Sequence, residues 1–135
     1  MIRPAIRSDQ AYVSHSWACS VLGSPSQWGP TAAAINAEID ACLDDKRTHV
    51  LVACDDANPD RIHGWVAFAK MPGARVLACL VVRREHRKQG MEHKLLERAQ
   101  LLGAGPALVH LYNLHAAVVA IVPNATKIEA REFLT

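Results

Sequence analysis

Apolar residues recur along this chain at two spacings, one typical of helices and one of strands. Helical spacing is found at Tyr12, Val13, Trp17 and Val21, and again at Ile35, Ile39 and Leu43. We therefore expect helices over about 10–22 and 32–46. Gly23 should end the first helix, and Thr31 should cap the second.

Short apolar runs between turn-forming residues predict strands. They cover residues 2–8, 50–54, 62–69, 75–82, 107–112 and 126–134. The run over 75–82 is apolar almost without interruption, which indicates a strand buried on both faces. A third helix is expected from about 90 to 103, whereas His115 to Val122 fits either a short helix or a strand.

Composition narrows the class of protein. The 135 residues suit a single domain, 1–135, and its core should be mainly aliphatic because few residues are aromatic. The net charge of +2 argues against nucleic acid as a partner. The sequence shows no signal peptide and no apolar run of membrane-spanning length, so we expect a cytoplasmic protein that does not engage a membrane.

The cysteines and histidines follow no metal-binding pattern. The four cysteines are Cys19, Cys42, Cys54 and Cys79, and no two of them form a Cys-x-x-Cys pair. The seven histidines include no His-x-x-x-His pair. We therefore expect reduced core thiols and no metal site.

Positive charge gathers directly after the most apolar strand. Five cations lie within twelve residues: Arg83, Arg84, Arg87, Lys88 and Lys94. Gly90 follows the densest part and precedes the third expected helix. The N–H groups of such a turn and of a helix N-terminus can converge on an anion, so this strand–turn–helix is a candidate pyrophosphate site. The alternative is an ordinary solvated connection with surface arginines.

These residues resemble the acyl-CoA-binding segment of the GNAT superfamily of N-acyltransferases, whose signature is Gln/Arg-x-x-Gly-x-Gly/Ala. Arg87 and Gly90 match that signature, and Glu92 stands where Gly or Ala is expected. Residues 2–5 and 62–67 are similar to the family's first and third strands. The expected order β-α-α-β-β-β-α-β is also that of the GNAT fold.

The likeness covers roughly residues 2–115. Around Ser16–Trp17 and Gly64–Trp65 the chain also resembles small GNAT-like proteins encoded by bacteriophages. The family resemblance implies an α/β fold with a mixed, mostly antiparallel central sheet flanked by helices.

It further implies acetyl-CoA as the cosubstrate. The cofactor-binding positions would be Leu80, Val81 and Val82 along the pantetheine and thioester, Arg87, Lys88, Gln89, Gly90, Met91 and Glu92 around the pyrophosphate, and Asn113 at the pantetheine. The strand could equally be an ordinary core strand, and Asn113 an ordinary turn residue. A carboxylate at Glu92 would compete with and repel a phosphate, and so should weaken the site.

Amine acylation needs a base for the amine and an acid for the departing thiolate. Many GNAT enzymes use a Glu and a Tyr, but residues 62–82 contain no Asp or Glu, and residues 115–122 contain no Tyr. The remaining catalytic candidates are His63 and Tyr112, each against the alternative of a packing role. We expect His63 to stand apart from the phosphate turn.

The function implied is transfer of an acetyl group from acetyl-CoA to a primary amine or a protein amino group. The alternative is a GNAT-like protein that has lost catalysis and serves as a binding or regulatory module. Among the tryptophans, Trp17 and Trp65 should pack in the core. Trp28 should be exposed in a loop, as part of a ligand or partner surface.

Overall fold

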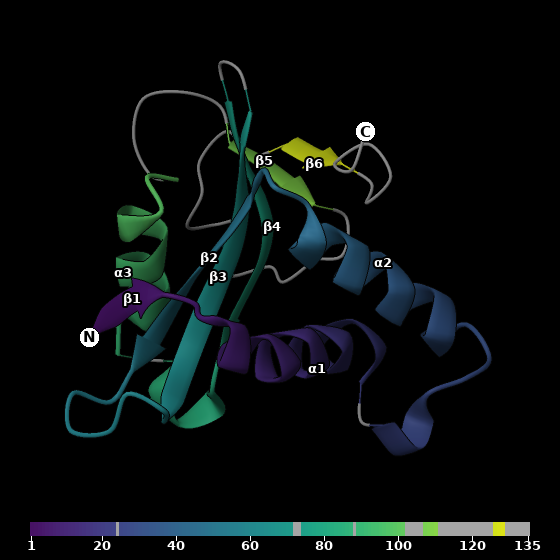
Figure 1. Ribbon diagram of the computed structural model, residues 1–135, viewed down its shortest axis with the longest axis horizontal. Helices are drawn as coiled ribbons and strands as arrows, with labels where there is room; N and C mark the ends of the chain where they lie inside the picture. The colour runs from purple at the N-terminus through teal and green to yellow at the C-terminus, as the bar shows by residue number, and fades with distance from the viewer. Residues whose placement is uncertain (24, 72–73, 88, 102–106, 111–125, 129–135) are drawn as a thin grey trace.

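The computed structural model describes residues 1–23, 25–71, 74–87, 89–101, 107–110 and 126–128 (Figure 1). The elements in chain order are β1 (Ile2–Pro4), η1 (Arg7–Asp9), α1 (Gln10–Leu22), η2 (Pro25–Gln27), α2 (Ala32–Asp44), β2 (Thr48–Cys54), β3 (Ile62–Met71), β4 (Ala74–Val82), η3 (Arg84–His86), α3 (Met91–Arg98), β5 (Ala107–His110) and β6 (Thr126–Ile128). The η elements are single 3₁₀ turns.

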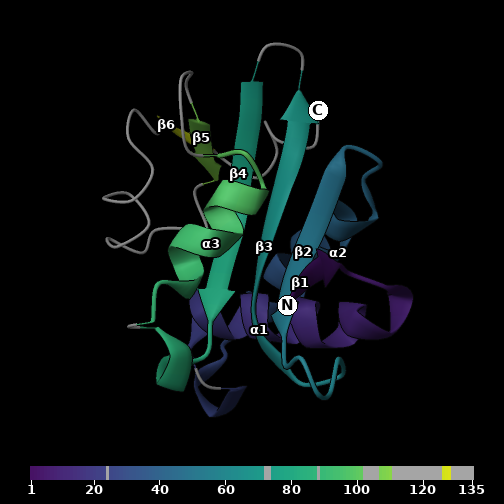
Figure 2. The ribbon, with the colours of Figure 1, turned by 90° about the vertical axis from the view of Figure 1, so that its left-hand side faces the viewer.

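The strands form one mixed sheet in the order β1-β2-β3-β4-β5-β6. The pairs from β1 to β4 are antiparallel, and β4–β5 and β5–β6 are parallel. Helices α1 and α2 cover one face and α3 covers the other (Figures 1 and 2). This confirms the predicted α/β class with a mixed, mostly antiparallel central sheet flanked by helices.

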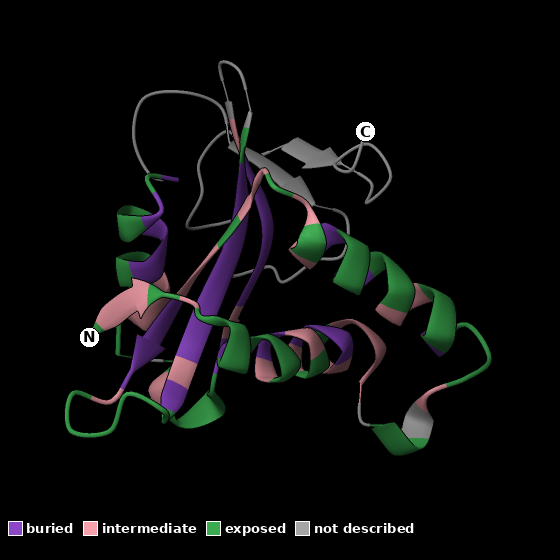
Figure 3. Cartoon of the chain, in the orientation of Figure 1, coloured by how far each residue is buried: buried purple, intermediate pink, exposed green. Residues whose placement is uncertain are grey.

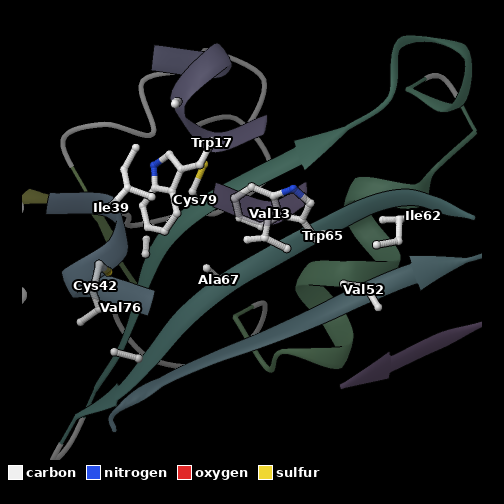
Figure 4. Close-up of a cluster of buried hydrophobic side chains, with 13 residues drawn as sticks. Val13, Trp17, Ile39, Cys42, Val52, Ile62, Trp65, Ala67, Val76 and Cys79 are labelled. Carbon is white, nitrogen blue, oxygen red and sulfur yellow. The ribbon is translucent and has the colours of Figure 1, made fainter. Parts of the chain in front are cut away.

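Two apolar clusters fill the layers on either side of the sheet. Trp17 and Trp65 anchor the cluster beneath α1 and α2, with both side chains fully buried and ring centroids 5.8 Å apart (Figure 4). Leu95 and Leu96 of α3 are buried in the second cluster. Figure 3 shows β3 and β4 buried along much of their length, as expected for central strands.

The prediction for Trp28 was wrong. Its side chain is half-buried and packs against the first cluster, and its indole Nε1 donates to the Gly23 carbonyl at 2.9 Å. The His15 ring lies 6.0 Å from it. The loop folds back on α1, so the indole finds both an apolar surface and a hydrogen-bond acceptor.

The first strand is shorter than the predicted 2–8, because Asp9 organises a turn. Its carboxylate accepts the Ile6 N–H at 2.8 Å and the Arg3 guanidinium at 2.8 Å. These two bonds favour a 3₁₀ turn over residues 7–9 in place of extended backbone. The same partners lower the pKa of Asp9, with the Arg3 hydrogen bond as the largest cause.

The third helix also ends earlier than predicted, at Arg98. The Gln100 N–H donates to Glu97 O at 3.0 Å and the Leu101 N–H to Leu96 O at 2.9 Å, the paired bonds of a Schellman cap. Gln100 takes the left-handed position with φ of 59°. That position usually belongs to glycine, which is why the sequence suggested a later end at Gly103.

All four cysteines are free thiols. Burial raises the pKa of both Cys42 and Cys79 to about 12, so these two are unreactive near neutral pH. No described helix has the length and apolar character needed to span a bilayer.

Candidate functional site

The described pairing between β4 and β5 ends before the middle of β4. In the part of the chain that the structure describes, β5 pairs with β4 from Arg75 to Leu77. At that point β4 carries a bulge, because Ala67 faces Cys79 and Phe68 faces Leu77, which leaves Ala78 unmatched. A bulge bends its strand and re-aims the following groups. The edge of β4 beyond Leu77 therefore has backbone groups that the described part of β5 does not pair.

The predicted strand residues Leu80, Val81 and Val82 lie on this stretch. Leu80 and Val82 point into the cluster beneath α3, and Val81 packs against the opposite cluster. All three side chains therefore contact core, and only the backbone of the strand is available to a ligand. Cys79 beside the bulge is buried and unreactive, which excludes it as a base.

At the end of β4 the chain makes the turn that leads into α3. Gly90 occupies the N-cap position with φ of 75° and ψ of 13°, a left-handed conformation that L side chains rarely adopt. A Cβ there would meet nothing within 4 Å. Glycine is therefore required by backbone angle rather than by lack of space, and the turn is open on that side.

The first N–H groups of α3 have no intrahelical acceptor, and no side chain caps the helix. The helix begins with Met91 and Glu92, and the first helical bond runs from the Lys94 N–H to Gly90 O at 3.1 Å. The positive end of the helix dipole is thus directed at the open side of the turn. This arrangement suits an anion.

Two side chains predicted to hold phosphate instead hold the turn. The Arg87 Nε donates to the Val82 carbonyl at 2.9 Å, which ties the guanidinium to the end of β4. Gln89 contacts Glu85 O at 3.4 Å and the His86 Nδ1 at 3.3 Å. Both residues are exposed. They position the loop, and the Arg87 charge remains beside it.

His63 is not one of the turn residues 87–92, but its ring contacts His86 just before them. It is the unmatched residue of a second bulge, because Ala53 faces Gly64 and Cys54 faces Ile62. The ring centroids of His63 and His86 are 4.0 Å apart. The Arg83 N–H donates to the His63 carbonyl at 2.8 Å, which places His63 at the C-terminal end of β4, beside the turn.

The surroundings of His63 favour the neutral form of its imidazole. Burial and, next, the neighbouring His86 lower the pKa of His63, while Asp55, with Oδ2 3.8 Å from Nε2, acts in the opposite direction. From Arg83 back to Cys79 is four residues, or roughly 13 Å of strand. His63 thus lies beside the turn, well away from the bulge.

Sequence reasoning missed Asp55 and His86, which with His63 form a chain of polar groups beside the turn. Asp55 also accepts the N–H groups of Ala57 and Asn58, so it holds the β2–β3 connection. A bulge has no clear sequence signal, so the sequence did not predict that His63 and His86 would be in contact. Lys88, Tyr112 and Asn113 lie outside the described residues.

No family model and no curated protein matches the sequence. Solved structures do match it. A GNAT-family protein from Desulfovibrio desulfuricans aligns with a TM-score of 0.50 and 20% identity over 73% of this chain and 62% of its own. A GNAT N-acetyltransferase from Escherichia coli, in complex with CoA, aligns with a TM-score of 0.50 and 23% sequence identity. The alignment covers 73% of this chain and 53% of the E. coli protein.

A transcriptional regulator from Bacillus halodurans gives a TM-score of 0.52 and 21% identity, covering 81% of this chain and 79% of its own. This chain covers less than two thirds of the two GNAT-family structures. At these identities the likeness concerns the fold. The protein has the GNAT acetyltransferase fold, which confirms the family resemblance at that level, while the bacteriophage likeness stays a prediction.

Proposed function

We propose that this protein binds acetyl-CoA along β4 and at the turn before α3. The observation that carries the proposal is the coincidence of two features on one strand. The described pairing of β4 with β5 ends at Leu77, beside a bulge at Ala78, and β4 leads into a turn with a left-handed Gly90 and uncapped N–H groups. An extended thioester arm suits the first feature and a pyrophosphate suits the second.

In this proposal the backbone of Leu80 to Val82 pairs with the pantetheine, and an N–H near the bulge polarises the thioester carbonyl. The N–H groups around Gly90 to Glu92 receive the pyrophosphate, with Lys88 as a further candidate. Arg87 and Gln89 hold the turn in the receptive shape through their bonds to Val82 O and Glu85 O. Asn113 stays a predicted pantetheine contact.

We further propose that the protein is an N-acyltransferase that passes the acetyl group to a primary amine or a protein amino group. The GNAT-fold neighbour with bound CoA supports this class of reaction. The amine nitrogen attacks the thioester carbonyl and its proton passes to a base or to solvent. The C–S bond then breaks, and CoA leaves as the thiolate, which takes a proton from an acid or from solvent.

His63 and Tyr112 stay the proposed catalytic groups. The lowered pKa of His63 is compatible with a base, but its contact with His86 favours a role in shaping the proposed phosphate end of the site. These roles differ in their kinetic effect. Loss of a base lowers kcat, whereas loss of a positioning contact weakens CoA binding.

The alternative is a catalytically inactive GNAT-like protein that binds a ligand or regulates another molecule. Glu92 favours this alternative, because it places a carboxylate in the first turn of α3. One structure with this fold is a transcriptional regulator. A cytoplasmic location remains part of the proposal.

Calorimetric titration with CoA tests binding, and an acetyl-transfer assay over a panel of amines tests catalysis. We expect saturable binding at one site that is lost in Gly90→Val. Binding without transfer to any amine or peptide would support the regulatory alternative. Absence of binding at millimolar CoA would contradict both the proposed acetyl-CoA site and the proposed acetyl transfer.

A further inference from the structure

A second cationic site lies at the opposite end of the α3 face. A cavity of about 440 Å³ opens between the C-terminal end of α3 and the adjoining ends of β2, β3 and β4. Its polar and aromatic lining includes His49, Phe68, Lys70, Arg75, Arg98 and Gln100. In Figure 2, α3 crosses this face with its C-terminal end toward the β3–β4 hairpin.

The alternation of the strands places these residues together. Phe68 packs in the cluster beneath α3, and Lys70, two residues on, shares its face. The sheet register sets His49 opposite Phe68 and Lys70 opposite Arg75. Two like charges directly opposite each other on neighbouring strands destabilise a sheet. The repulsion between Lys70 and Arg75 therefore lowers the stability of the sheet, and the described contacts give no stabilising reason for it.

The described part of the chain places no carboxylate against this positive charge. No Asp or Glu is among the described residues that line the cavity. Within the described part of the chain, Lys70, Arg75 and Arg98 form no ion pair. A cation is favourable at the C-terminal end of a helix, which accounts for Arg98 and for the contact of Arg75 with Ala99 O, but not for Lys70.

Arg75 is held in place as a binding group would be. Its guanidinium carbon lies 5.7 Å from the Phe68 ring centroid, its NH1 donates to Ala99 O at 3.3 Å, and its NH2 donates to Gln100 Oε1 at 2.8 Å. Gln100 reaches this position from the left-handed backbone conformation that closes α3. A strained residue thus orients a charged one at the rim of a cavity.

The charges of Lys70 and Arg75 act on His49, whose titration can therefore be used to detect a bound anion. Burial, followed by the nearby Lys70 and Arg75, lowers the pKa of His49. Its ring lies 5.7 Å from the Phe68 ring centroid. An anion in the cavity would counter both cations and reverse that part of the effect.

We propose that this cavity binds a small phosphorylated molecule, at a site separate from the β4–α3 turn. The volume falls within the range of small-molecule sites, roughly 300–1,000 Å³. The cations surround one cavity and form no extended track, which favours a small anion over nucleic acid. The two sites lie at opposite ends of β4, with Arg75 at its beginning and the turn after Val82.

Inorganic pyrophosphate is the probe, titrated at physiological ionic strength and followed by NMR at the His49 ring and the Lys70 and Gly90 amides. We expect saturable shifts at His49 and Lys70. Lys70→Gln and Arg98→Gln should each weaken this binding about fivefold. Arg61→Gln, an equal loss of charge at the other end of β3, should leave it unchanged.

The site-resolved signals separate this cavity from the turn, so failure of CoA binding at Gly90 leaves the result at His49 intact. Both Lys70 and Arg98 are exposed, and a melting curve for each variant checks that it is folded. No saturable shift at His49, or an equal loss in Arg61→Gln, would overturn the proposal. Binding of a single-stranded oligonucleotide more tightly than pyrophosphate would also overturn it, in favour of nucleic acid.

Discussion

The two ends of the α3 face both carry several cations, but they use them differently. At the turn, Arg87 is tied to the Val82 carbonyl, and the histidines lie beside Asp55. At the hairpin end, Lys70 faces Arg75 across the strands with no carboxylate in the cavity lining. The first end combines charge with backbone N–H groups, whereas the second relies on side-chain charge.

This difference should appear in how each end binds an anion. Backbone N–H groups have fixed directions, so the turn can select the shape of a ligand. Side-chain cations in solvent act through Coulomb attraction that salt screens within about 10 Å. We therefore expect binding at the hairpin end to depend more strongly on salt.

The largest effect should come from Gly90→Val. A β-branched residue at φ of 75° is strained by about 1–3 kcal/mol, and the turn will relax away from its receptive shape. CoA affinity should fall more than tenfold by calorimetry. Gly29→Val is the matched control, because Gly29 has open space and no positive φ. Equal affinity in the Gly90 variant would show that the turn does not hold the ligand.

The second prediction concerns Glu92 in the first turn of α3. Glu92→Gln removes a carboxylate that repels phosphate, so CoA should bind about fivefold to thirtyfold tighter, equivalent to roughly 1–2 kcal/mol. Glu97→Gln removes the same charge farther along the helix and should change the affinity much less. Unchanged or weaker binding in Glu92→Gln would mean that its side chain points away from the phosphates.

The third prediction separates the two roles of His63. If it supports the turn through His86, His63→Ala should weaken CoA binding about threefold to tenfold and leave kcat within about tenfold. If it is the base, kcat should fall about 100-fold or more while affinity holds. The position of His63 leads us to expect the first pattern. Steady-state kinetics and calorimetry on the same variant decide between them.

The fourth prediction concerns the hairpin end without ligand. Lys70→Gln removes one of two opposed like charges, so the free energy of unfolding should rise by about 0.2–1 kcal/mol. Arg61→Gln should not stabilise the protein in this way. Urea denaturation at low salt provides the measurement. A loss of stability in Lys70→Gln would mean that the lysine is anchored by contacts stronger than the repulsion.

The smallest effect is a pH dependence shared by both ends. His49 and His63 have pKa values lowered from 6.5 in the folded protein, so the unfolded chain binds protons first as the pH falls. Folding stability should therefore decrease as the pH drops below about 6.5, through the window down to the folded values. His49→Gln and His63→Gln should each flatten this part of a stability profile. A profile unchanged in both variants would contradict the assignment.

The strands and helices that carry strong periodicity were predictable. Helix α1 was expected over 10–22 and is found at Gln10–Leu22, and the apolar run over 75–82 is indeed the central β4. The Arg87 and Gly90 spacing also located the turn. These features depend on residues close in sequence, so local physical chemistry was sufficient.

Other features needed contacts between distant segments. Trp28 looked exposed because its acceptor, Gly23 O, becomes available only when the loop folds back. The contact of His63 with His86 depends on a bulge and on strand register, and the position of the Lys70–Arg75 hairpin pair beside His49 and Arg98 depends on register and on helix packing. The local pattern of residues predicts neither the bulges nor the register.

The sequence by itself determined the fold class, the central strand and the glycine turn, because each follows from local periodicity or backbone preference. Only the tertiary structure decided which charged groups share an end of the sheet. A bulge of one residue re-aims a side chain, and register decides which side chains face each other across strands. For that reason the polar chain at the turn and the second cationic cavity became visible only once the strands were paired.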